Sequence, residues 1–133
     1  MRYLKDNILN EALVQYFEEG KISKITMGFR IHPHQDLVET LKKHEYPGYL
    51  NFVNKCKDID DLKYLRQDTH QGINMIKKIK DIIADDGTKY KNRDNSKYVK
   101  AGITTKDCDL TIKFYTDKVL PAITARIKEL KEK

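Results

Sequence analysis

The chain has 133 residues, of which 35% are charged and 39% hydrophobic, and its formal net charge is +6. This length suits a single domain, which we expect to span residues 1–133. No stretch approaches the roughly 18 consecutive apolar residues of a membrane span, and the N-terminus lacks the apolar core of a secretory signal, so we expect neither a membrane protein nor a secreted one.

The first predicted element in chain order is a helix over residues 6–19. Its apolar residues recur every three or four positions, and Gly20 can take the left-handed conformation that ends a helix. Residues 24–32 then alternate between apolar and other side chains, with Ile25, Met27, Phe29 and Ile31 on one side. This period of two predicts one strand near 24–32, which would need a partner strand to satisfy its backbone.

A polar turn and two short helices are predicted next. His32, His34 and Asp36 are metal-ligand residue types, but their spacing favours a turn over a metal site. One short helix starts after Pro33, and a second covers residues 49–56 after a Pro-Gly break.

The most strongly predicted helix begins at Asp58 or Asp60, either of which can cap it, and ends before Gly87. Gly72 lies inside it and indicates either a close helix crossing or a break. One apolar stripe of period near 3.5 runs along this helix, formed by Ile59, Leu62, Leu65, Thr69, Ile73, Ile76, Ile79 and Ile83.

A capped corner precedes the last predicted helix, which covers residues 105–131. Gly102 can end a short helix, and Thr104 with Asp107 matches the capping-box spacing. Pro121 should interrupt and kink the last helix. Together these elements predict a mainly α fold, a small helical bundle with one minor β element near 24–32.

The positive charge is concentrated in residues 87–106, since residues 1–86 are neutral and residues 107–133 carry +1. This basic segment carries a net charge of +5. Lysine and arginine bind phosphates through charge, and exposed tyrosines can stack on bases. We therefore predict an anionic partner, which is a nucleic acid, a nucleotide or an acidic protein, and these binding residues: Lys89, Tyr90, Lys91, Arg93, Lys97 and Tyr98.

Arg66 and His70 are four residues apart on the long helix and share one face of it. A general base and a cation so placed could cleave RNA. The pair resembles the Arg-and-His motif of the HEPN ribonucleases, which are small helical proteins, although that motif places more than three residues between the Arg and the His. The alternative is that Arg66 and His70 lie on the solvent face beside Asp68.

Three aspartates gather at the end of the same helix. Asp81 and Asp85 are one helical turn apart, and Asp86 follows, so the set could bind a hard cation such as magnesium. Helical NTP pyrophosphatases use paired acidic motifs of this kind, but with more glutamates than this chain has.

The sequence thus favours a small non-enzymatic binding or regulatory protein that presents a basic segment to an anionic partner. The alternative is a helical nuclease or nucleotide hydrolase that uses Arg66 and His70 or the three aspartates. We expect no cofactor, and we expect a homodimer because a lone strand needs a partner. Cys56 and Cys108 have no disulfide or metal spacing, so we expect free thiols and a cytoplasmic location.

Overall fold

The computed structural model describes Gly20 and residues 37–132. The helix predicted over residues 6–19 and the strand predicted near 24–32 lie outside these described residues. The same holds for the polar turn that contains His32, His34 and Asp36.

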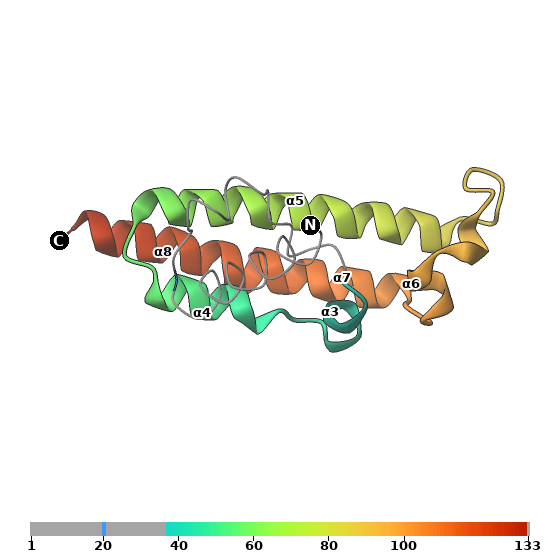
Figure 1. The fold of residues 1–133 in the computed structure, drawn as a ribbon, viewed down its shortest axis with the longest axis horizontal. Helices are drawn as coiled ribbons and strands as arrows, with labels where there is room; N and C mark the ends of the chain where they lie inside the picture. The colour runs from blue at the N-terminus through green and yellow to red at the C-terminus, as the bar shows by residue number, and fades with distance from the viewer. Residues whose placement is uncertain (1–19, 21–36, 133) are drawn as a thin grey trace, which may run out of the picture.

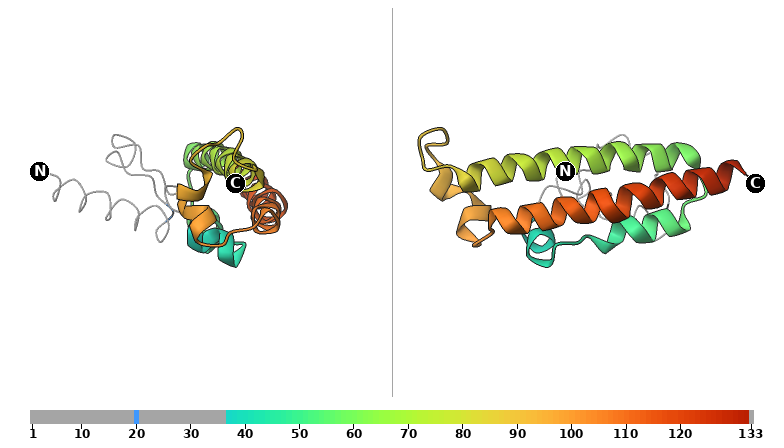
Figure 2. Two further views of the ribbon diagram at one scale, coloured as in Figure 1. Left: turned by 90° about the vertical axis from the view of Figure 1, so that its right-hand side faces the viewer. Right: turned by 180° about the vertical axis from the view of Figure 1, so that it is seen from behind.

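The described part is a small helical bundle built on two long antiparallel segments, which confirms the mainly α prediction (Figure 1). One segment is α5 (Ile59–Ala84). The other is formed by α7 (Thr105–Phe114), the π-helical turn η3 (Tyr115–Val119) and α8 (Leu120–Lys131). α5 contacts both α7 and α8, and the view from behind in Figure 2 shows the two segments side by side.

Shorter helices cover one side of this pair. α3 (Val38–Lys43) packs on α7, and α4 (Pro47–Lys55) packs on α8. At one end of the bundle, a loop leads from α5 through the 3-10 turn η2 (Arg93–Asn95) to α6 (Lys97–Lys100). None of the helices described is both long and apolar enough to cross a membrane.

α5 forms as its sequence predicts. Asp58 is the N-cap, since its Oδ1 accepts hydrogen bonds from the backbone N–H groups of Asp60 (2.8 Å) and Asp61 (3.2 Å). The helix runs unbroken through Gly72, which is buried. The predicted stripe is confirmed at its centre, where Leu62, Leu65, Thr69, Ile73, Ile76 and Ile79 are buried.

The corner before α7 also forms as predicted. Gly102 has a φ of 78° and follows α6. The Thr104 hydroxyl accepts from the Asp107 N–H at 3.1 Å, and the Asp107 carboxylate accepts from the Thr104 N–H at 2.9 Å, which completes the capping box. His44 ties the end of α3 to this cap, because its Nε2 lies 2.7 Å from the Asp107 carboxylate.

The interruption predicted at Pro121 takes the form of the π-helical turn η3. The N–H of Leu120 bonds to the carbonyl of Tyr115, five residues earlier. Proline has no N–H, and its ring clashes with the carbonyl four residues earlier in a regular α-helix. A wider turn just before Pro121 relieves this clash, and α7, η3 and α8 remain one continuous helix (Figure 1).

The core lies between the two long segments and the shorter helices α3 and α4. Its largest fully buried side chains are Tyr49, Tyr115, Phe52, Leu37, Leu41, Leu62, Leu65, Ile76, Ile123 and Val119. Cys56 and Cys108 are buried free thiols, as predicted.

The end of α4 is held from two sides. Arg126 of α8 donates from Nε to the carbonyl of Cys56 at 3.0 Å. Gly20 is buried against the same point with a φ of 68°, the left-handed conformation predicted for it. A Cβ atom at Gly20 would lie 2.8 Å from the backbone N of Cys56 and 2.9 Å from the backbone C of Lys55.

Candidate functional site

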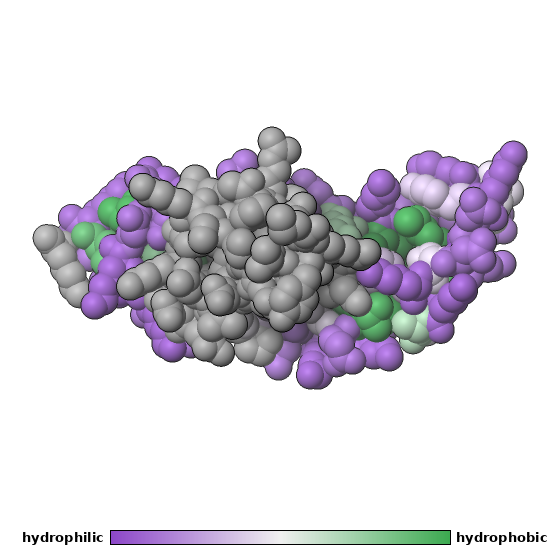
Figure 3. Space-filling view, in the orientation of Figure 1, coloured by the Kyte–Doolittle hydropathy of each residue, from purple (hydrophilic) through white to green (hydrophobic). Residues whose placement is uncertain are grey.

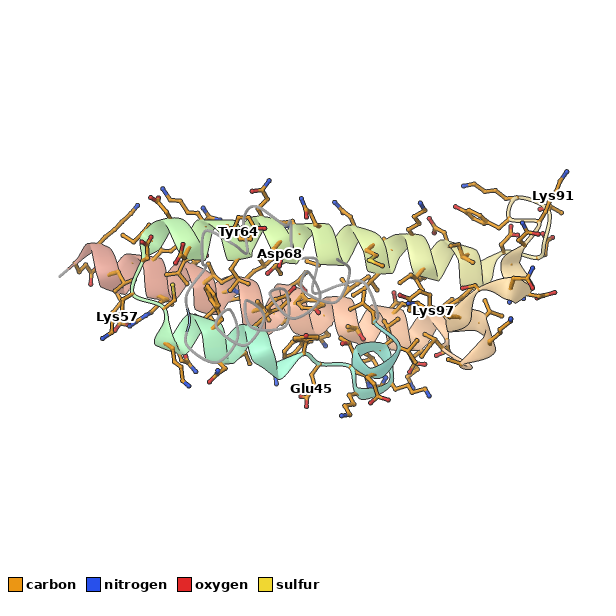
Figure 4. The ribbon with its side chains drawn as sticks, viewed as in Figure 1. Glu45, Lys57, Tyr64, Asp68, Lys91 and Lys97 are labelled. Carbon is orange, nitrogen blue, oxygen red and sulfur yellow. The ribbon has the colours of Figure 1, made fainter. Side chains whose placement is uncertain are left out.

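The basic segment forms the loop end of the bundle, where the chain turns from α5 toward α6 and α7. Lys91 lies at the tip of this loop in Figure 4. Lys89, Lys91, Lys97, Lys100 and Lys106 are all exposed. Hydrophilic residues dominate this end of the surface in Figure 3.

Asp85 holds the loop in shape. Its Oδ2 accepts from the N–H groups of Gly87 (2.8 Å) and Tyr90 (3.1 Å), and its Oδ1 accepts from that of Lys89 (3.4 Å). Partial desolvation raises the pKa of Asp85, but these three bonds outweigh it and hold the pKa below the ordinary 3.8. The carboxylate therefore takes the place that a bound anion would take among these backbone donors.

Asp86 has a similar local role. Its Oδ1 accepts from the Thr88 hydroxyl at 2.7 Å and from the Thr88 N–H at 3.1 Å, and these bonds lower its pKa. Asp81 is exposed one turn earlier. Asp85 and Asp86, which were predicted as candidate metal ligands, thus accept hydrogen bonds from the loop backbone. Within the described residues, no group of three His, Cys, Asp or Glu side chains is placed to hold a metal ion.

These bonds predict how the loop responds to acid. A carboxyl group whose folded pKa lies below its unfolded value stabilises above the unfolded pKa, and that contribution is lost as the pH falls through the folded pKa. We expect the amide resonances of Gly87 and Tyr90 to shift as the pH falls, with a midpoint below the ordinary carboxyl pKa of 3.8. NMR titration would measure this.

Asp85→Ala is the matched variant for that titration. It should shift the same two amide resonances already at neutral pH and leave the amide of Asp60, at the other end of α5, unchanged. Loop amides that titrate with an ordinary midpoint in the parent protein would contradict the Asp85 bonds.

Arg93 anchors the loop to α5. Its Nη2 donates to the carbonyl of Ile83 at 2.9 Å, and its Nη1 pairs with Asp94 at 3.0 Å. The Ile83 carbonyl belongs to the last turn of α5, where carbonyls lack helical partners. Arg93 was predicted to bind a ligand, and the structure gives it a capping role as well.

Tyr98 also differs from the prediction. Its ring is 7% exposed and belongs to the core, and its hydroxyl oxygen accepts from the N–H of Leu37 at 3.5 Å. Lys97 lies beside it, with Nζ 5.3 Å from the ring centroid. Tyr98 cannot stack on a base without leaving the core, so Tyr90 is the tyrosine of this segment that remains half-exposed.

A hollow of about 440 Å³ lies beside the loop. Ile82 supplies an apolar wall, and the Lys89 Nζ lies 5.3 Å from the centroid of the Tyr90 ring. The full lining consists of Ile82, Lys89, Tyr90, Lys91, Asn92, Arg93 and Ser96. The hollow therefore combines cations, one aromatic ring and neutral hydrogen-bonding groups.

Arg66 and His70 lie on α5, half-buried and exposed respectively, and neither lines this hollow. The prediction placed Asp68 beside them on the solvent face. That placement is wrong, because Asp68 is buried and only 5% exposed. Asp68 falls three residues after Leu65 and so follows the helical stripe inward.

Asp68 marks a buried polar cluster that the sequence prediction missed. Its Oδ2 accepts from the Tyr49 hydroxyl at 3.3 Å, and Figure 4 shows it one turn from Tyr64 on α5. Burial, and then the charge of Asp68, raise the pKa of both Tyr46 and Tyr64. Its place at a stripe position is the signal that could have revealed it.

No protein family model, curated protein or solved structure matches this chain. The candidate site is therefore defined by its own geometry.

Proposed function

We propose that this chain is a small binding protein that acts by occupancy and presents its loop end to an anionic partner. The observation that carries this proposal is that Asp85 and Asp86 accept hydrogen bonds from the loop backbone, while Lys89 and Lys91 are exposed on the loop. The aspartates fix the loop, so the lysines are offered on a defined surface rather than on a free arm. Exposed Lys97, Lys100 and Lys106 extend the positive charge along the same end.

A nuclease or nucleotide hydrolase has less support among the described residues. Asp85 and Asp86 both accept hydrogen bonds from the loop, and among the described residues no group of three His, Cys, Asp or Glu side chains is placed to hold a cation. Arg66 and His70 lie outside the hollow that the basic residues line. The predicted homodimer and cytoplasmic location stay predictions.

Charge neutralisation at the loop tests the proposal. Binding of single-stranded oligothymidylate and of polyglutamate should weaken in Lys89→Gln/Lys91→Gln. The salt dependence of oligothymidylate binding should fall by about 1.4 in its logarithmic slope, because two phosphate contacts are lost. Fluorescence anisotropy over a salt series would measure both.

The matched control is Lys57→Gln/Lys128→Gln, which makes the same charge change at the opposite end of the bundle. It should leave the salt slope at its parent value. Equal weakening by the two variants would show that net charge alone governs binding, and the proposal would then fail.

A further inference from the structure

We infer that the hollow beside the loop binds one nucleoside phosphate, with its base against Tyr90 and its phosphates at Lys89 and Lys91. This inference rests on the proposed function and names the ligand of the same site.

The number of available aromatic rings sets the number of bases. Binding a strand without sequence preference uses successive aromatic side chains on which successive bases stack. The basic segment has two tyrosines, but Tyr98 is in the core, so Tyr90 is its one half-exposed ring. Ile82 adds an apolar wall beside it. The site therefore suits a single base.

The cations lie close to the ring on which the base would stack. Lys89 holds its Nζ over the face of the Tyr90 ring, 5.3 Å from the centroid. A base that stacks on this face displaces the Nζ, and the long flexible lysine side chain then meets the phosphate of the same ligand. Lys91 lines the same hollow. A volume of about 440 Å³ falls within the roughly 300–1,000 Å³ of small-molecule sites.

The remaining donors indicate how selective the site is. The loop N–H groups of Gly87, Lys89 and Tyr90 already bond to Asp85, so they form no phosphate cradle. The two arms of Arg93 bond to Ile83 and Asp94, so no free guanidinium fork is offered. Lysines act as point charges. We therefore expect the number of phosphates to matter more than the identity of the base.

Calorimetric titration of the full chain tests this with five probes, which are adenosine, adenosine monophosphate, adenosine diphosphate, guanosine diphosphate and inorganic pyrophosphate. The diphosphate should bind most tightly, and about fivefold more tightly than the monophosphate, as expected for one added charge near a surface lysine. Guanosine diphosphate should bind within a few-fold of adenosine diphosphate.

Variants separate the two halves of the site. Tyr90→Ala should weaken adenosine diphosphate about 5- to 150-fold, the range for losing one stacked base, and leave pyrophosphate unchanged. Tyr90→Phe should keep full affinity, because the ring remains. Lys89→Gln/Lys91→Gln should weaken both ligands.

Different results would overturn the proposed function and the nucleotide inference. Oligothymidylate or polyglutamate binding that depends on Lys89 and Lys91, without binding of adenosine diphosphate, would overturn the nucleotide inference and leave the proposed function standing. Equal affinity for pyrophosphate and the diphosphate would also overturn it. Binding of no anion at this end would overturn both.

Discussion

Tyr115→Ala should lower the free energy of unfolding by about 3–5 kcal/mol, the range for a large aromatic residue removed from a core. Tyr115 is fully buried where α7 gives way to α8, and its ring centroid lies 5.6 Å from that of Tyr49 and 5.5 Å from that of Phe114. Burial raises the pKa of its phenol, consistent with an apolar setting. Urea unfolding followed by circular dichroism would measure the loss.

Tyr90→Ala is the control, since it removes the same side chain from the loop. It should change stability by less than about 0.5 kcal/mol, as surface substitutions usually do. The two variants also separate stability from binding, because Tyr90 lines the hollow and Tyr115 does not. A small effect of Tyr115→Ala would mean that this part of the core is not packed as described.

Gly20→Ala should lower the free energy of unfolding by more than the addition of one methyl group suggests. A left-handed φ of 68° costs an alanine about 1–2 kcal/mol. Its Cβ would also lie 2.8 Å from the backbone N of Cys56, and overpacking of this kind adds about 1–3 kcal/mol. Backbone atoms cannot swing aside as the end of a side chain can.

Gly102→Ala isolates the first of these terms. Gly102 has a φ of 78°, and a Cβ there would meet no atom within 4 Å. Gly102→Ala should therefore lose only the stability that the left-handed conformation costs an alanine. Thermal denaturation of both variants then gives the steric contribution at Gly20 by difference. Identical losses would show that residue 20 does not contact the end of α4 in solution.

Features set by neighbours in sequence could be predicted for this chain. The Asp58 cap, the Thr104 and Asp107 capping box and the stripe of α5 depend on residues within a few positions of one another. Helical periodicity and capping operate over one or two turns, so a sequence window contains the whole cause.

Features set by tertiary contacts could not be predicted. Tyr98 appeared suited to stacking, but its hydroxyl meets Leu37, which is 61 residues away. Arg93 reaches back to Ile83, and Asp68 meets Tyr49 across the bundle. In each case the residue type suggested exposure, and the partner that explains its position comes from another element. The basic site is consequently smaller than the segment that suggested it.

The π-helical turn η3 changes the spacing of the buried positions along the last helical segment. A bond from Leu120 to Tyr115 encloses one residue more than an α-helical bond does. The segment therefore resembles an α-helix with one inserted residue. The helical repeat of buried positions in α8 is shifted by one residue relative to that in α7. Cys108 and Thr111 belong to the phase before the turn, and Ile123 and Ile127 to the phase after it. One unbroken heptad frame cannot describe both halves, although both face α5.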